Sequence, residues 1–272
     1  MKRPITLILG GALVSLVVAM AVVSLFWTPF DPIRVVPSSR LLPPSWPHVM
    51  GTDGLGIDIF SRILIGSRVC LLVGVIAVGI GALLGVPLGM IAGTTRGTVG
   101  RLIMRSTDIL YAFPALLLAI LLAAARGGGS TTTAMVAIGV ASVPAFARVA
   151  RGATLQVMSQ DFVLAARASG TPRPLIAVNH VLPNIAPVIL VQSSVSFGMA
   201  ILSEAALSYL GLSAPPTEPT WGRMLQEAQK YLFNDPNQSV WPGLFIALAV
   251  LGFNLLGDGL REVLDPRLKE VR

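Results

Sequence analysis

Hydrophobic residues gather in long uncharged runs along this chain, with shorter polar segments between them. Because the hydrocarbon core of a bilayer is about 30 Å thick, a helix needs about 20 predominantly apolar residues to cross it. Runs of this length predict an all-α integral membrane protein with six transmembrane helices. We expect these helices at residues 5–27, 69–93, 109–125, 131–147, 181–202 and 241–257.

Composition indicates the same class of protein. Of the 272 residues, 54% are hydrophobic and 12% charged, whereas soluble domains have about 45–50% and about 25%. The net charge of +7 also occurs in nucleic-acid-binding proteins, but those gather Lys and Arg on one face. Here the basic residues are scattered between apolar runs, so we expect the lipid bilayer as a partner and no nucleic acid. The single cysteine, Cys70, excludes an internal disulfide and a Cys-based zinc site, and we expect no metal site.

The distribution of basic residues predicts the orientation of the chain. If the N-terminus is cytoplasmic, the inside segments hold most of the 20 Lys and Arg residues, as cytoplasmic loops generally do. Both termini are therefore predicted in the cytoplasm. Lys2 and Arg3 before an apolar run also resemble a signal peptide. Because the run continues to Trp27, it is long enough to span, and we expect an uncleaved first helix.

Glycines recur at intervals of four in the second run, at Gly81, Gly85, Gly89 and Gly93. Residues i and i+4 share a helix face, and small residues let helices approach closely in lipid. The groove they form predicts helix packing, mainly inside this chain. Contact with a second membrane subunit is the alternative.

Three prolines fall inside the apolar runs. Each removes one backbone hydrogen bond from a helix, and in membrane proteins such prolines mark kinks. We expect kinks at Pro87, Pro114 and Pro144.

One inside segment has the pattern of a short helix. Ser159 is a candidate N-cap, and Asp161 would lie in the first turn, near the positive end of the helix dipole. Gly170 with Pro172 two residues later predicts the end of the helix. One face would combine an aromatic residue with small ones. Such a face suits a groove on another protein or a position along the membrane surface, and the pattern leaves both open. The residues of this face are Phe162, Ala165, Ala166 and Ser169.

The same segment resembles the "EAA" loop of bacterial ABC importer permeases. That pattern is Glu-Ala-Ala, three residues, Gly, nine residues, then Ile-x-Leu-Pro. This chain has Ala165, Ala166, Gly170, Leu182 and Pro183 at the family spacing, but Leu164 replaces the Glu, and His180 replaces the Ile. The resemblance implies that this helix couples the permease to an ATPase. The candidate coupling residues are Asp161, Phe162, Leu164, Ala165, Ala166, Arg167, Ser169 and Gly170.

Four stretches resemble the dipeptide/oligopeptide/nickel branch of these permeases, in its C-type subunit. They cover residues 51–62, 161–184, 204–222 and 254–267, in the family order. Asp53 and Asp58 in the first stretch are interpreted as turn and N-cap residues, because they lack the spacing of a calcium loop. The fold implied is the type I ABC importer permease architecture.

The resemblance divides the chain into two parts. Residues 1–68 would form the N-terminal transmembrane helix and a Pro-rich periplasmic loop. Residues 69–272 would form the permease core with five transmembrane helices, and its EAA loop would cover about 148–183. The protein would be a multi-pass component of the bacterial inner membrane.

The chain has no Gly-x-x-x-x-Gly-Lys-Ser/Thr sequence, so it has no phosphate-binding loop for ATP. We therefore expect a transport subunit that is not itself an enzyme and carries no cofactor. ATP and Mg would bind to partner ATPase subunits. The resemblance implies a sister permease, two ATP-binding subunits and an extracytoplasmic solute-binding protein. Short peptides are the expected substrates, with nickel or other metal chelates and glutathione as alternatives. A secondary transporter that works without ATP is the rival hypothesis.

Overall fold

The chain is described here by a computed structural model that covers residues 5–95, 97–125, 129–213, 215, 217–233 and 235–264. Within these ranges the regular structure is helical, with one isolated antiparallel bridge between Thr52 and Asp58. The long helices are α1 (Ile5–Phe26), α2 (Ile59–Thr94), α5 (Thr131–Met158), α8 (Leu182–Tyr209) and α10 (Asn237–Leu264). The shorter elements are η1 (Pro37–Ser39), α3 (Thr98–Ala112), α4 (Ala115–Ala125), α6 (Asp161–Ala168), α7 (Arg173–Ile176), the π-helical turn η2 (Ala177–Val181), α9 (Trp221–Ala228) and η3 (Gln229–Tyr231).

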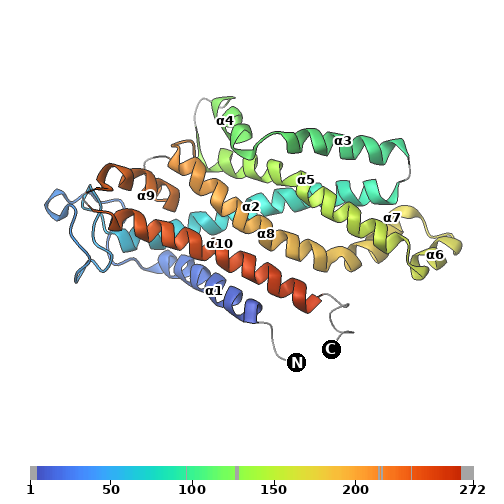
Figure 1. The fold of residues 1–272 in the computed structure, drawn as a ribbon, viewed down its shortest axis with the longest axis horizontal. Coiled ribbons are helices and arrows are strands. Elements are labelled where there is room, and N and C mark those ends of the chain that lie inside the picture. The colour runs from blue at the N-terminus through green and yellow to red at the C-terminus, as the bar shows by residue number, and fades with distance from the viewer. Residues whose placement is uncertain are drawn as a thin grey trace.

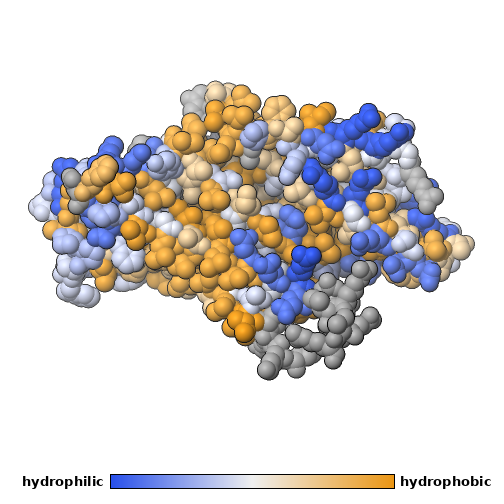
Figure 2. Space-filling view, in the orientation of Figure 1, coloured by the Kyte–Doolittle hydropathy of each residue, from blue (hydrophilic) through white to orange (hydrophobic). Residues whose placement is uncertain are grey.

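The long helices run side by side along the longest axis of the molecule (Figure 1). The loop before α2 and the helix α9 lie at one end, which we call the α9 end. Helices α6 and α7 lie at the opposite end, the α6 end. Figure 2 shows hydrophobic side chains covering much of the middle of this face, whereas hydrophilic residues gather toward both ends. This distribution suits a bundle whose middle lies in lipid.

Five helices are long and apolar enough to cross a membrane without interruption, and the expected third span is broken. Helices α3 and α4 meet at a bend of 86°, so the single helix expected over residues 109–125 was wrong. Proline disfavours helical conformation in the residue before it, and Phe113, before Pro114, is extended (φ −84°, ψ 121°). The expected break at Pro114 is thus confirmed, while Pro87 and Pro144 lie inside continuous helices. Among the described residues, the structure thus has five unbroken helices that can span a membrane, and six spans if the bent pair of α3 and α4 counts as one.

Helices α2, α5, α8 and α10 are longer than the apolar runs that predicted them, whereas α1 ends one residue before the expected Trp27. Helix α2 begins at Ile59 rather than residue 69, because Asp58 caps it: its Oδ2 accepts a hydrogen bond of 2.8 Å from the backbone N–H of Ser61. Helix α5 continues to Met158 and α8 to Tyr209. Hydrophobicity marks the part of a helix in lipid, whereas caps and breakers decide where the helix ends.

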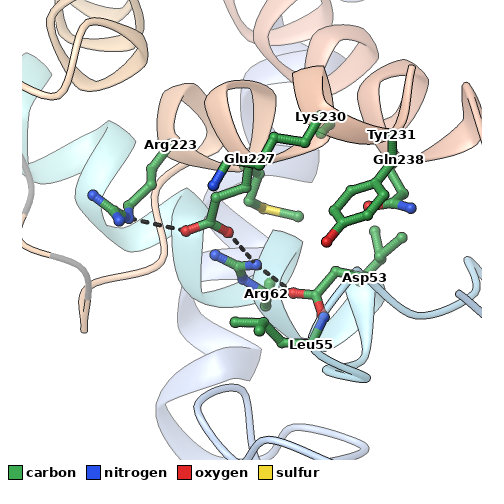
Figure 3. Close-up of a pocket in the computed structure, with 12 residues that line it drawn as sticks. Asp53, Leu55, Arg62, Arg223, Glu227, Lys230, Tyr231 and Gln238 are labelled. Atoms are coloured by element: carbon green, nitrogen blue, oxygen red, sulfur yellow. Dashed lines mark hydrogen bonds and ion pairs between the residues drawn. The ribbon is translucent and has the colours of Figure 1, made fainter. Parts of the chain in front are cut away.

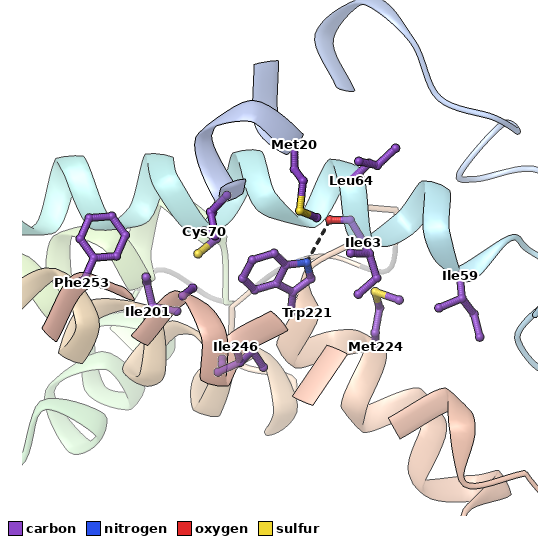
Figure 4. Close-up of a cluster of buried hydrophobic side chains, with 13 residues drawn as sticks. Met20, Ile59, Ile63, Leu64, Cys70, Ile201, Trp221, Met224, Ile246 and Phe253 are labelled. Carbon is purple, nitrogen blue, oxygen red and sulfur yellow. Dashed lines mark hydrogen bonds between the residues drawn. The ribbon is translucent and has the colours of Figure 1, made fainter. Parts of the chain in front are cut away.

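A hydrophobic cluster at the α9 end joins α9 to the membrane helices (Figure 4). Trp221 is 2% exposed, and its Nε1–H donates a hydrogen bond of 3.0 Å to the backbone oxygen of Ile63 on α2. Gly66 leaves room for the indole, since a Cβ there would lie 2.5 Å from Trp221 Cδ1. Helix α9 is therefore seated against α2, with its first residue inside the core.

The four glycines at intervals of four are buried, and they face α5 of the same chain. A Cβ at Gly85 would lie 2.6 Å from the oxygen of Val143, and one at Gly89 would lie 2.3 Å from that of Ala147. A Cβ at Gly81 would overlap the side chain of Ser142, and one at Gly93 would overlap that of Thr154. Side chains at these four positions would force the two helices apart, so the groove is filled within this chain.

Candidate functional site

Helix α6 projects at its end of the molecule, directly after α5 (Figure 1). Only Ser159 and Gln160 separate the two helices. The prediction that Ser159 caps α6 was wrong. Ser159 has helical backbone angles at the end of α5, and its Oγ donates to the oxygen of Gln156 at 2.8 Å. Because α5 extends to Met158, the N-cap position of α6 falls on Gln160, which has no side-chain cap bond.

Helix α6 ends as the sequence predicts. Gly170 has φ +81°, a conformation that glycine adopts without steric cost. Its N–H donates to the oxygen of Arg167, and the N–H of Thr171 donates to the oxygen of Ala166 at 3.1 Å. This pairing is the Schellman type of helix end, which satisfies the last carbonyl groups.

Val163 attaches α6 to the rest of the bundle. Its side chain is fully buried, in a hydrophobic cluster with Met158, Phe146 and Ile176. Ala166 is half-buried on the same side and packs against this cluster. Val163 was not among the residues predicted for this site, and the prediction that Ala166 lies on the docking face does not account for its packing against the core. The signal available was the spacing of three residues between them, which puts both on one side of a helix.

The outward face of α6 consists of small and polar residues between two exposed apolar side chains. Phe162 is 44% exposed and Leu164 is 49% exposed. Ser169, just past the end of the helix, donates from Oγ to the oxygen of Ala165 at 3.0 Å. The exposed candidate coupling residues are Asp161, Phe162, Leu164, Ala165, Arg167, Ser169 and Gly170.

The chain returns from α6 to the bundle through α7 and the π-helical turn η2. The rings of Phe162 and His180 lie in tilted contact, with centroids 6.2 Å apart. Nδ2 of Asn184 donates to the backbone oxygen of His180 at 2.7 Å. Short π-helical turns are often found at functional sites. Here the turn places His180 against the aromatic residue of α6.

A charged network lies at the opposite end, between the loop before α2 and α9. Figure 3 shows Arg62 between Glu227 of α9 and Asp53 of the loop. Nη1 of Arg62 pairs with Asp53 Oδ2 and with Glu227 Oε2, the latter at 2.7 Å. Asp53 Oδ1 also accepts from the backbone N–H groups of Leu55 and Ile57 at 2.8 and 2.9 Å. The interpretation of Asp53 as a turn residue and of Asp58 as an N-cap is confirmed.

No sequence pattern predicted that Arg62 joins the loop before α2 to α9. The network lines a pocket of ≈ 250 Å³ together with Tyr231, Gln238 and Lys230. Parts of the family signatures at Pro216 and at residues 265–267 lie outside the described residues.

The arrangement of helices is similar to that of a chain of the MetNI methionine ABC transporter, which was solved in inward-facing conformations. The likeness has a TM-score of 0.64 at 18% identity and covers 75% of this chain and 97% of that chain. A second crystal form of the same transporter gives 0.62, also at 18% identity, over 74% of this chain and 95% of that chain. The fold is therefore that of a type I ABC importer permease.

Sequence comparison identifies the family. Residues 85–270 match the family described as "Binding-protein-dependent transport system inner membrane component". The glutathione transport system permease protein GsiD of Pectobacterium atrosepticum is 43% identical over 261 residues, 96% of this chain and 86% of the relative. The dipeptide transport system permease protein DppC of Alkalihalophilus pseudofirmus is 39% identical over 269 residues, 99% of this chain and 88% of the relative. The chain belongs to this family and is a membrane-spanning permease subunit of an ABC importer.

Proposed function

We propose that this chain forms half of a translocation pathway for short peptides, driven by ATPase subunits that dock on α6. A sister permease completes the pathway, two ATP-binding subunits lie beneath the pair, and a solute-binding protein delivers the substrate to the α9 end. ATP and Mg bind to the ATPase subunits, and this chain holds no cofactor of its own. The α6 end and both termini face the cytoplasm.

The outward face of α6 carries this proposal. Docking needs a surface that is exposed, shallow enough for another protein to approach, and held firmly by its own chain. Ala165 and Ser169 leave the face shallow, while Phe162 offers an exposed apolar contact. Val163 and the Schellman end of the helix fix its orientation. A helix that fits a groove by a few apolar anchors is a recurrent mode of recognition.

The relatives support a peptide as substrate. The two similar permeases belong, by name, to a glutathione and a dipeptide transport system. Glutathione is itself a tripeptide, so both names describe small peptides with free carboxylates. We therefore assign short peptides as the substrate class, with glutathione as the alternative to a dipeptide.

Affinity purification of the tagged chain from native membranes in mild detergent tests the docking face. The structure selects Ala165→Glu as the variant, because Ala165 is exposed whereas Ala166 packs against the core. The added charge lies in the middle of the proposed contact, at an exposed position. The wild type is expected to bring down a second permease and an ATPase, and Ala165→Glu to keep the permease but lose the ATPase.

Ala165→Ser is the matched control, because it keeps a small side chain at the same position. It should retain both partners. An ATPase that remains bound to Ala165→Glu would rule out α6 as the docking site. A wild type that brings down no ATPase, under conditions that preserve other membrane complexes, would rule out the proposed assembly.

A further inference from the structure

A cleft of ≈ 660 Å³ opens at the α6 end, between the end of α2, the start of α3, the end of α5 and α6. Its lining combines small residues of the α2–α3 connection with side chains from α5 and α6. Two of the candidate docking residues of α6, Leu164 and Arg167, are among the residues that line this cleft.

Three arginines from three different helices face this cleft: Arg101 of α3, Arg151 of α5 and Arg167 of α6. No Asp or Glu is among the residues that line it. In the part of the chain that the structure describes, none of the three forms an ion pair. The cleft therefore gathers positive charge without an internal counter-charge.

The guanidinium groups have weak partners in this chain. Arg167 Nη2 lies 3.8 Å from the sulfur of Met158, and Arg101 Nη2 lies 3.5 Å from Thr98 Oγ1. Nε of Arg151 is buried and has no hydrogen-bond partner among the described residues. A buried donor without an acceptor is costly, and Arg donors fit the oxygens of a phosphate or carboxylate especially well.

The start of α3 adds to the attraction for an anion. Gly97, at the N-cap position, has no side chain to pair with the first N–H groups of the helix. The N-terminus of a helix carries a partial positive charge, and its free N–H groups bind anions. Leu164, in the lining of the cleft, occupies the position at which the "EAA" pattern has a glutamate. This chain therefore has an apolar side chain there, and no carboxylate to neutralise the arginines.

Exposed apolar side chains surround the charged lining. Leu155 and Leu164 in the cleft are each 49% exposed, and Val99 and Leu102 on α3 beside it are 55% and 58% exposed. A soluble anion gains nothing from contact with exposed leucine and valine side chains. A phospholipid can bind both parts of this surface, because its acyl chains are attached to its phosphate. Basic pockets between membrane helices on the cytoplasmic side bind acidic headgroups.

We propose that this cleft binds the phosphate group of an acidic phospholipid of the cytoplasmic leaflet. The proposal rests on the orientation given under the proposed function, in which the α6 end is cytoplasmic. The lipid phosphate accepts hydrogen bonds from Arg101, Arg151 and Arg167, and its acyl chains lie against the leucines. A headgroup in this position braces α6 against α3 and α5, so lipid composition sets how firmly the docking helix is held.

Native mass spectrometry of the purified importer complex tests the proposal. Dioleoylphosphatidylglycerol and dioleoylphosphatidylcholine are offered in equal amounts, and the lipid that stays bound is counted. The wild type is expected to retain the acidic lipid preferentially. Arg101→Gln should weaken that retention about fivefold, because each basic side chain near the surface contributes about 1 kcal/mol to the binding of an anionic lipid.

Arg105→Gln is the matched control, since Arg105 is an exposed arginine of α3 outside the cleft lining. It should change retention by less than about twofold, because solvent screens a charge that makes no direct contact. Leu164→Glu is a second probe that leaves all three arginines in place. It adds a carboxylate among them and is expected to abolish the preference for the acidic lipid without any loss of positive side chains.

The arms of the experiment separate the sources of the phosphate. If inorganic phosphate raises the melting temperature of the wild type but not of Arg101→Gln, and the acidic lipid shows no preference, the cleft binds a soluble phosphate. If neither phosphate nor the acidic lipid distinguishes wild type from Arg101→Gln, the proposal is overturned. Loss of the ATPase from Arg101→Gln with unchanged lipid retention would assign the arginines to the ATPase contact instead. Loss of the ATPase from the wild type would contradict the proposed function. The comparison of lipid retention between wild type and Arg101→Gln would still test the lipid site by itself.

Discussion

Arg62 of α2 forms an ion pair of 2.7 Å with Glu227 of α9, and the same guanidinium group pairs with Asp53. The Arg62 side chain is 5% exposed, whereas the side chains of Asp53 and Glu227 are 10% and 29% exposed, so the guanidinium group is buried and the Glu227 carboxylate still reaches water. One basic side chain thus connects the loop before α2, the start of a membrane helix and α9. These are the segments from which the surface for a solute-binding protein would be built.

Arg62→Gln is expected to lower the free energy of unfolding by about 3 kcal/mol, because it leaves the Asp53 carboxylate without its positive partner and Glu227 with Arg223 alone. Thermal unfolding of the purified complex in detergent measures this change. Arg40→Gln is the control: Arg40 also reaches across to Tyr231, but its hydrogen bond of 3.1 Å is exposed, and its loss should cost less than about 1 kcal/mol. Equal stabilities of the two variants would contradict the role given to the buried network.

Val163→Ala should loosen α6 while the membrane helices remain folded. The substitution removes two methyl groups from a fully buried position, which costs about 2 kcal/mol. Because α6 makes its main apolar contact through this residue, the loss falls on the local stability of the helix. Hydrogen–deuterium exchange of the α6 amides is expected to become faster. Leu164→Ala, at an exposed position of the same helix, should leave the exchange unchanged, and the opposite order would show that Val163 is not the anchor.

Gly89→Ala is expected to destabilise the bundle by about 1–3 kcal/mol, because its Cβ would lie 2.3 Å from the backbone oxygen of Ala147. A backbone atom has no rotamer by which to move aside, so α2 and α5 must separate. The melting temperature in detergent reports this separation. Gly79→Ala is the matched control on the same helix, since a Cβ at Gly79 meets nothing within 4 Å. A Gly79→Ala variant as unstable as Gly89→Ala would mean that helix flexibility, and not the contact, causes the loss.

Cysteine labelling on intact and permeabilised cells tests the orientation of the chain in the membrane. Cys70 is the single cysteine of the sequence and is buried. A Cys70→Ser variant therefore provides a background without thiols. Ser45 and Ser169 are exposed residues at opposite ends of the molecule. A membrane-impermeant maleimide should label Ser45→Cys on intact cells and Ser169→Cys only after the membrane is permeabilised. The reverse pattern would invert the proposed topology.

The membrane helices were predictable because lipid selects long apolar runs, but their ends were not. The capping bond from Asp58 to Ser61 starts α2 ahead of the apolar run, and α5 continues past Ala147 into polar sequence. Pro114 carried a clear signal for a break. The extent of the bend between α3 and α4 depends on how both helices pack against α5, which no local pattern contains.

At the candidate site, the sequence located α6 and the glycine that ends it, but not the side of the helix that faces the bundle. The half-buried position of Ala166 follows from the packing of Val163 with Phe146 and Ile176, which belong to other helices, α5 and α7, and meet α6 only in the folded chain. The pair of Arg62 and Glu227 was hidden for the same reason. Arg62 and Glu227 lie far apart in the sequence, so no local pattern relates them before the chain folds.

Helix α2 contains 36 residues, which corresponds to ~54 Å at 1.5 Å per residue. It begins beside the Arg62 network and ends at the lining of the arginine cleft, and the glycine contacts bind it to α5, the helix that leads into α6. One continuous helix, α2, thus runs from the α9 end to the α6 end. Along the half nearer the α6 end it packs tightly against α5. We expect a displacement of α6 to reach the α9 end as a tilt of α2 and α5 together, because the close glycine contacts leave little room for one helix to move without the other.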